Sequence, residues 1–234
     1  MNLINVSRYL PILSTIISAC FAWVILARYR LKPEAHHLLW WGLGVITYGA
    51  GTLIESWNTL FGWSAPLFKA WYIAGALLGG APLAIGSIYL LHGKRLGHTA
   101  VIVLLLVVGI TSVFVILSPI RYELVDPHLL NSKVLGWQGI RRVSPFINSA
   151  AFLFLVGGAA YSAVRFFKHV ESRHVSIGNI FIAIGALLPG IGGIGSRMGH
   201  TEWLYLGEFV GVILIWIGYK RCLRPLPSLS VEYA

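Results

Sequence analysis

Long apolar stretches alternate along the chain with short segments that carry most of its charged residues. Seven stretches reach the length of about 20 residues that a helix needs to cross a hydrocarbon core of roughly 30 Å. They are residues 9–27, 38–60, 70–91, 99–120, 145–164, 175–196 and 203–219. The strands of a membrane barrel would instead show alternating polarity over about ten residues. The pattern therefore predicts an all-α, polytopic membrane protein with seven transmembrane helices.

The composition agrees with this prediction. Of the 234 residues, 57% are hydrophobic and 11% are charged, whereas soluble domains carry about 25% charged residues. So few charges cannot cover a water-facing globule of this length. We therefore expect one transmembrane domain at residues 1–224, followed by a short cytoplasmic tail at residues 225–234. The lipid bilayer is the partner that such a composition implies.

The basic residues point to a membrane orientation. A net charge of +10 would suggest a nucleic-acid partner for a soluble protein. Here most lysines and arginines flank the apolar stretches, where they set the orientation of membrane helices, so we expect no nucleic-acid partner. Alternate connections are the richer ones, and they contain Arg28, Arg30, Lys32, Lys94, Arg95, Arg165, Lys168, Arg173, Lys220, Arg221 and Arg224.

The positive-inside rule places these richer connections in the cytoplasm. In an integral plasma (inner) membrane protein, the N-terminus then lies outside and the C-terminus lies in the cytoplasm. The longest connection, residues 121–144, lies outside as well.

The third and seventh stretches align with each other without gaps. The matched positions are Trp71 with Trp203, Gly75 with Gly207, Gly79 with Gly211, and Gly86 with Gly218. Both stretches cross the membrane in the same direction, which fits a parallel repeat of two three-helix units joined by the fourth helix. This layout resembles the three-plus-one-plus-three organisation of SWEET-type sugar transporters, and the resemblance implies a transporter.

The same glycines also have a purely structural interpretation. Small residues four positions apart, such as Gly75 and Gly79, allow two helix backbones to approach closely. Glycine and alanine faces of this kind are also where a second copy of the chain, or a partner in a membrane complex, would pack.

The sixth stretch contains Pro189 among four glycines, at positions 190, 192, 193 and 195. Proline removes a backbone donor and glycine lowers helix propensity, so we expect the outer half of this helix to be kinked or unwound. Irregular backbone inside a bilayer must face protein or a water-filled cavity. The alternative is a tightly packed, glycine-rich helix.

Two acidic residues, Glu55 and Glu208, fall inside predicted spans. A charged group at the bilayer centre costs roughly 2.5–3.5 kcal/mol on insertion scales, so such residues are usually functional or paired. Polar residues at helical spacing accompany both acids, which predicts an outward-side pocket between the second, sixth and seventh helices. Its expected lining for a small-molecule solute is Tyr48, Thr52, Glu55, Arg197, His200, Tyr205 and Glu208. The alternative is an ion pair between an acid and Arg197 that only holds the helices together.

Histidines gather at the predicted cytoplasmic ends of the helices: His36, His37, His92, His98, His169 and His174. Three histidines with a bound water can form a catalytic zinc site, which would make the protein a lipid hydrolase. The HxxxH spacing of the alkaline ceramidases is absent, and histidine is also at home at a membrane interface. We therefore expect no metal, no cofactor and no catalytic residue.

These observations favour a small-solute transporter or permease that is not an enzyme. The alternatives are a non-enzymatic membrane receptor or an accessory subunit of a membrane complex, and a histidine-metal lipid hydrolase at the cytoplasmic face.

The orientation gives the first testable prediction. A reporter enzyme fused after Ala234 is expected to be active only in the cytoplasm, because the positive-inside rule places that end there. Activity of the same fusion on the outer side of the membrane would overturn the orientation.

Overall fold

In the computed structural model, the described residues are 7–127, 129–168 and 170–223, with Arg197 described by its backbone alone. Within them the protein is all-α: it is 86% helical and contains no β-strand. The predicted tail at residues 225–234 and His169 lie outside the described residues.

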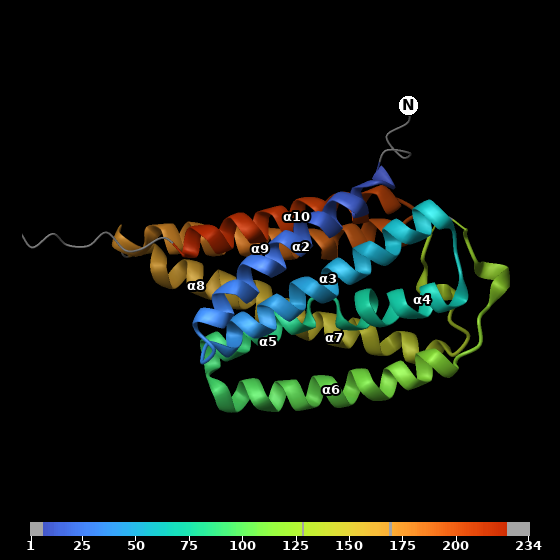
Figure 1. Ribbon diagram of the computed structural model, residues 1–234, viewed down its shortest axis with the longest axis horizontal. Helices are drawn as coiled ribbons and strands as arrows, with labels where there is room; N and C mark the ends of the chain where they lie inside the picture. Colours follow the sequence, from blue (N-terminus) through green and yellow to red (C-terminus); the bar gives the residue numbers. More distant parts are fainter. Residues whose placement is uncertain (1–6, 128, 169, 224–234) are drawn as a thin grey trace, which may run out of the picture.

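The helices follow one another as a bundle of long rods (Figure 1). In chain order they are α2 (Leu10–Leu31), α3 (His36–Phe61), α4 (Ala65–Trp71), the π-helix η1 (Tyr72–Leu78), α5 (Ala81–His92), α6 (Lys94–Leu117), α7 (Val143–Phe152), the π-helix η5 (Leu153–Gly157), α8 (Gly158–Phe167), α9 (Arg173–Arg197) and α10 (Thr201–Cys222).

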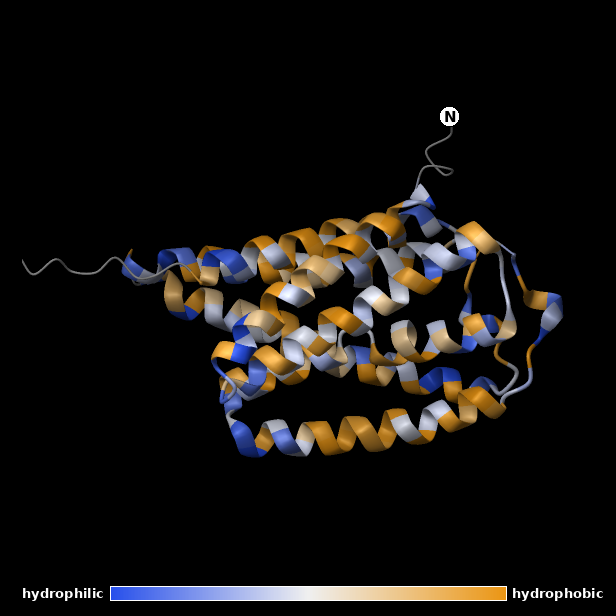
Figure 2. Ribbon diagram, viewed as in Figure 1, coloured by the Kyte–Doolittle hydropathy of each residue, from blue (hydrophilic) through white to orange (hydrophobic). Residues whose placement is uncertain are grey.

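Six helical segments of the described chain are long and apolar enough to cross a membrane. They are Leu10–Leu31, Ala65–His92, Lys94–Leu117, Gln138–Phe167, Val170–Ser196 and Thr201–Cys222. The remaining long helix, α3, has 26 residues and is about 39 Å long at 1.5 Å per residue, but polar side chains lower its hydropathy. Figure 2 shows orange, apolar residues along most of the helical surface and blue, polar residues toward the helix ends.

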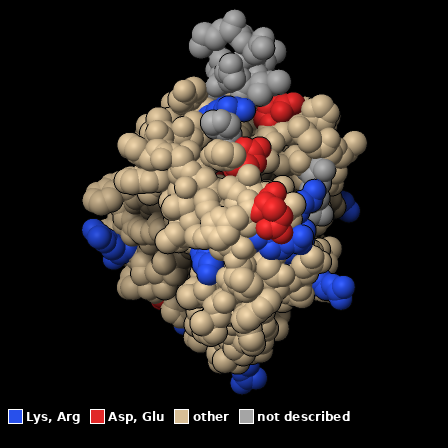
Figure 3. All heavy atoms as spheres, turned by 90° about the vertical axis from the view of Figure 1, so that its right-hand side faces the viewer, with Lys and Arg blue, Asp and Glu red and all other residues tan. Residues whose placement is uncertain are grey.

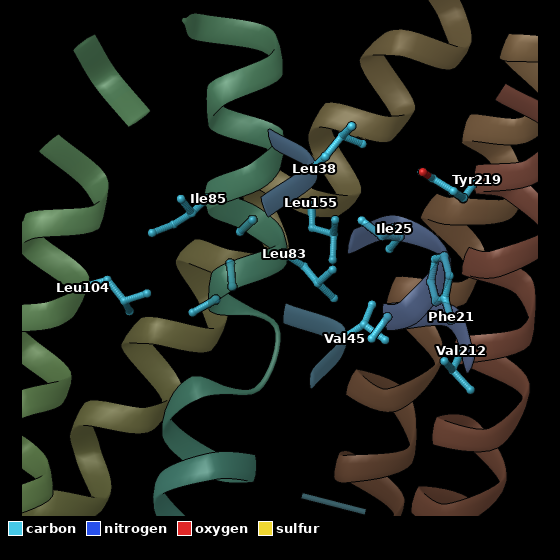
Figure 4. Packing of buried hydrophobic residues seen from close by; sticks show 14 of the residues in the cluster. Phe21, Ile25, Leu38, Val45, Leu83, Ile85, Leu104, Leu155, Val212 and Tyr219 are labelled. Carbon is cyan, nitrogen blue, oxygen red and sulfur yellow. The ribbon is translucent and has the colours of Figure 1, made fainter. Parts of the chain in front are cut away.

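The core and the outer surface are both apolar, as expected of a protein with lipid around it. Phe21, Ile25 and Leu83 are buried in the main cluster between the helices (Figure 4). On α6, by contrast, Leu105 and Ile110 are about 60% exposed. The helix α6 lies at the edge of the bundle and packs mainly against α5 (Figure 1).

The two ends of the bundle differ. At one end lie short connections between α2 and α3, α5 and α6, and α8 and α9 (Figure 1). The long connection between α6 and α7 lies at the other end, and contains η2 (Tyr122–Leu124), η3 (Ser132–Val134) and η4 (Gln138–Arg142). Figure 3 shows acidic and basic side chains together on this second end.

The third predicted span is not one regular helix. The π-helix η1 leads to Gly79, which has φ +32°, and α5 begins two residues later with Pro82 in its first turn. Such a φ suits glycine because it has no Cβ. From α7, the Asn148 side chain donates a hydrogen bond to the main-chain oxygen of Ala76, 2.9 Å away. The interruption is therefore satisfied by a neighbouring helix.

The predicted disruption of the sixth span does not occur, because α9 continues as a helix through Pro189. Its glycines allow α10 to approach instead. A Cβ added to Gly192 would lie 2.5 Å from the main-chain oxygen of Trp203, and one added to Gly185 would lie 2.6 Å from that of Gly211. The tight-packing interpretation of this segment is the one that the structure supports.

The aligned glycines of the third and seventh spans make comparable contacts. An added Cβ on Gly75 would meet Gly51 of α3, and one on Gly207 would meet Leu188 of α9. Each glycine thus faces the preceding long helix of its own half.

Gly86 and Gly218 follow the same rule, since they face Trp41 of α3 and Gly178 of α9. The pair Gly79 and Gly211 does not, because Gly79 lies at the interruption and Gly211 within a continuous helix.

Replacing Gly79 by alanine tests the interruption. The new Cβ would lie 2.9 Å from the main-chain oxygen of Gly75 and 3.0 Å from Oδ1 of Asn148, in backbone that alanine rarely adopts. We expect a loss of about 1–3 kcal/mol in stability, measured by thermal unfolding in detergent. Gly109→Ala is the matched control, because nothing lies within 4 Å of its added Cβ. A Gly79 variant as stable as this control would contradict the argument.

Candidate functional site

The two buried acids meet inside the bundle. Glu55 on α3 is only 5% exposed, and its carboxyl group lies close enough to that of Glu208 on α10 for the two groups to interact directly. Glu55 Oε1 accepts a hydrogen bond from Trp71 Nε1 at 2.9 Å. The Oε2 atoms of both acids are buried and have no donor among the described residues. The structure therefore brings two carboxyl groups together, and the indole of Trp71, the last residue of α4, donates a hydrogen bond to one of them.

Two tyrosines surround this pair. The Tyr48 hydroxyl, two turns before Glu55 on α3, donates to the main-chain oxygen of Glu208 at 2.8 Å. Tyr205 on α10 is 5% exposed and lies close enough to both acids to interact with them electrostatically. Residues 48 and 55 share a face of α3, while residues 205 and 208 share a face of α10, so helical spacing alone brings the four side chains together.

Thr52 belongs to the same face of α3 but contacts a different helix. Its Oγ1 lies 2.9 Å from Oγ1 of Thr15 on α2, and either hydroxyl can donate. Thr52 also donates to the main-chain oxygen of Gly49. It is 2% exposed, so its contribution is to pack α2 against α3 beside the carboxyl pair.

His200, one of the two predicted basic partners, does not pair with either buried acid in the described part of the structure. His200 is exposed and forms an ion pair of 3.1 Å with Glu202 at the start of α10. The side chain of Arg197 lies outside the described part of the structure. Among the described side chains, neither buried carboxyl is in an ion pair. At the bundle end with the long connection, Arg8 and Asp126 also lie close enough to Tyr205 to interact with it electrostatically.

Two facing carboxyl groups in a site closed to water have specific chemistry. Two unit charges 4 Å apart repel by about 4 kcal/mol at an effective dielectric constant of 20. A single proton bound to either group removes this repulsion. It also gives that group an O–H donor, which neither carboxylate has when ionised. The pair can therefore hold and release a proton.

A cavity of about 440 Å³ lies in the other half of the bundle. Its wall comes from α2, α3, α5, η5 with α8, α9 and α10, and it includes none of the seven residues predicted to line a solute pocket. Figure 4 shows six of the lining residues close together between the helices: Phe21, Ile25, Leu38, Leu83, Leu155 and Tyr219. A second void, of about 20 Å³, has Phe21, Leu83 and Ile215 in common with the large cavity and also touches Tyr48.

The cavity escaped the sequence analysis because no local pattern describes it. Its residues come from six helices that are distant in the chain. The available signal was a set of polar residues near helix ends, such as Arg28, Arg165 and Asn179, which topology alone also explains.

The histidines do not form a metal centre in the described part of the chain, where no three potential ligands come together. His36 and His98 lie edge to face at 5.8 Å, with Tyr89 against both. His37 packs on Trp41 and lines the cavity.

No protein-family model, no curated protein and no solved structure matches the chain.

Trp71→Phe tests the contact between the indole and the acid. The change keeps an aromatic ring but removes the hydrogen bond that the Trp71 indole donates to the Glu55 carboxyl group. Leaving a buried acceptor unpaired costs about 1–3 kcal/mol, so the apparent melting temperature in detergent should fall. The control is Trp57→Phe, since Trp57 is on the same side of the bundle but 53% exposed. Equal melting temperatures for the two variants would show that the hydrogen bond contributes nothing.

Proposed function

We propose that this protein is a seven-helix membrane transporter or permease for a small solute, in which Glu55 and Glu208 form a proton-exchanging site between α3, α9 and α10. The observation that carries the proposal is the buried carboxyl pair. A like-charged pair is a poor way to hold helices together, because apolar residues of similar volume would pack without its cost. Acids retained in a membrane segment are typically functional.

The helix α3 serves as the seventh span in this proposal. Its polar side chains face other helices and not lipid: Thr52, Glu55, Ser56 and Asn58 are each at most 5% exposed. These residues explain why α3 is less apolar than the other long helices. It packs against both α2 and α5, as an inner helix does.

The proposed topology places the N-terminus and the carboxyl pair toward the outside and the large cavity toward the cytoplasm. The bundle end with the short connections holds Lys94 and Arg95 at the start of α6, and Arg165 near the end of α8. This distribution agrees with the positive-inside rule.

The contacts of the aligned glycines support a parallel repeat of three helices, one linking helix and three helices. In each half, the third span packs glycines against the second: Gly75 and Gly86 against α3, and Gly207 and Gly218 against α9. The helix α6, at the edge of the bundle, would be the linking helix.

The positions of the carboxyl pair and the large cavity are compatible with an alternating-access mechanism. The large cavity occupies the half of the bundle with the short connections, while the carboxyl pair lies in the other half behind Tyr48. Between them Phe21, Leu83 and Ile215 leave a void of only about 20 Å³, which has room for about one water. A structure closed at the outer site and hollow at the inner one is what an inward-facing transporter state requires.

Solute-driven proton movement tests this function. Purified full-length protein is reconstituted in liposomes that contain a pH-sensitive dye, and gradients of a monosaccharide, an amino acid and a short monocarboxylate are applied in turn. We expect at least one gradient to change the internal pH, and Glu55→Gln or Glu208→Gln to reduce the change to that of empty liposomes.

Glu202→Gln is the matched control, because Glu202 lies on α10 but pairs with His200 at the surface. This variant should behave like the parent protein. Proton movement that persists in both buried-acid variants would contradict the proposal, as would its absence with all three solutes. A lower melting temperature of the Glu55 variant without any change in flux would identify the pair as structural.

A further inference from the structure

The cavity of about 440 Å³ has the size of a ligand site. Pockets for small molecules typically enclose roughly 300–1,000 Å³ and are mostly apolar with a few placed polar groups. This cavity is separate from the carboxyl pair, and the proposed function uses it only as the space that is open in an inward-facing state.

The side chains that line the cavity change along its length, from apolar ones in the middle of the bundle to basic ones near the helix ends. Along α2, Phe21 lies seven residues before Arg28, which is about 10 Å at 1.5 Å per residue. Along η5 and α8, Leu155 lies ten residues before Arg165, or about 15 Å. The two guanidinium groups are both near the ends of their helices, so an apolar interior leads to a positively charged mouth.

Within the described part of the chain, these two guanidinium groups are not paired with an acidic side chain. No acidic residue lines the cavity, and neither Arg28 nor Arg165 is in an ion pair with a described side chain. His37 lies close enough to Arg28 for the two side chains to interact electrostatically. Guanidinium groups bind carboxylates and phosphates through paired hydrogen bonds.

A buried hydroxyl also lacks a partner. Tyr219 is 4% exposed, lines the cavity, and its hydroxyl oxygen makes no hydrogen bond among the described residues. Figure 4 shows this oxygen pointing away from α10, toward Leu38 and Ile25. Arg28 acts on the same hydroxyl electrostatically. A buried polar group without a partner calls for an explanation, and a bound ligand supplies one.

The rim of the cavity reaches the outer surface of the bundle. Leu90 on α5 and Tyr161 on α8 line the cavity, yet they are 52% and 59% exposed. In a bilayer these two residues lie at the lipid-facing surface. A molecule with an apolar chain can therefore enter from the membrane side and keep its polar end at the mouth.

We propose that this cavity binds a single-chain amphiphile with an anionic headgroup, whose chain occupies the space around Phe21, Leu83 and Leu155 and whose headgroup is held by Arg28, Arg165 and the Tyr219 hydroxyl. The cavity volume suits one chain and not a phospholipid with two. Carboxylate and phosphate headgroups share the required chemistry, and the experiment distinguishes them.

The test uses full-length protein in nanodiscs of neutral phosphatidylcholine. Palmitate carrying a photoactivatable diazirine on its chain is the probe, and labelled peptides are mapped by mass spectrometry. We expect labelling on the cavity-lining parts of α2, α8 and α10. Unlabelled palmitate should compete, whereas hexadecanol, which lacks the negative charge, should not. A diazirine lysophosphatidate probe, used in parallel, identifies the preferred headgroup by the stronger labelling.

Substitutions separate the cavity from general lipid contact. Changing both Arg28 and Arg165 to Gln should reduce labelling by about tenfold or more, because charge-assisted hydrogen bonds are lost. Arg30→Gln is the matched control: Arg30 lies two residues along α2, over the ring of Trp23 and outside the cavity. Ser87→Leu should also reduce labelling, since Ser87 lines the cavity and the larger side chain fills it while all charges remain.

The outcomes that would overturn the site are equally specific. Competition by hexadecanol as strong as that by palmitate would show that no headgroup is recognised. Labelling confined to the lipid-facing surface of α6, or unchanged labelling in both the double arginine variant and Ser87→Leu, would show that the cavity is not occupied. If the double variant does not fold, as judged by gel filtration, Ser87→Leu and Tyr219→Phe decide the question. Because every readout is binding, failure here leaves the proton-flux result on Glu55 and Glu208 unaffected.

Discussion

Inside a bilayer, no water is available to satisfy a polar group, so each one needs a partner within the protein. This constraint accounts for the contacts that join distant parts of the chain. Tyr48 reaches across to the main chain of α10, and Asn148 reaches a carbonyl at the interrupted third span. Nine described residues nevertheless keep a buried side-chain oxygen or nitrogen without a hydrogen-bond partner among the described residues. Three of them lie at the places discussed above: Glu55 and Glu208 at the carboxyl pair, and Tyr219 at the cavity.

Close packing provides the rest of the cohesion, since lipid chains are as apolar as the helix surfaces and provide no hydrophobic force between helices. The glycines of α9 and α10 bring two backbones so near that an added Cβ on Gly185 or Gly207 would lie 2.6 Å from a carbonyl oxygen of the other helix. This contact fixes α10 against α9, and therefore fixes where Glu208 meets α3. The position of the carboxyl pair thus depends on residues that have no chemistry of their own.

Local properties of the sequence were sufficient for the helices and for the two acids. Span length and the rarity of charge inside a span can be recognised without knowing the neighbours. The continuity of α9 through Pro189 could not be, because the close approach of α10 decides it. For the same reason Thr52 pairs with α2, and His200 with Glu202 at the surface. The cavity could not be predicted from the sequence because it lies between six helices. No single stretch of the chain determines how those helices pack.

The π-helical segments η1 and η5 occupy the middle of two spans, and each is followed by a helix that lines the cavity. A π turn accommodates one residue more than an α turn, and one residue corresponds to about 100° of rotation around the helix axis. The segment η5 runs without a break into α8, so the face of α8 that presents Gly158, Ser162 and Arg165 to the cavity is set by a surplus residue upstream. The number of residues within Leu153–Gly157 therefore sets the rotation of α8 relative to α7. Removing one residue there would rotate the cavity wall toward lipid without changing a single side chain that lines it.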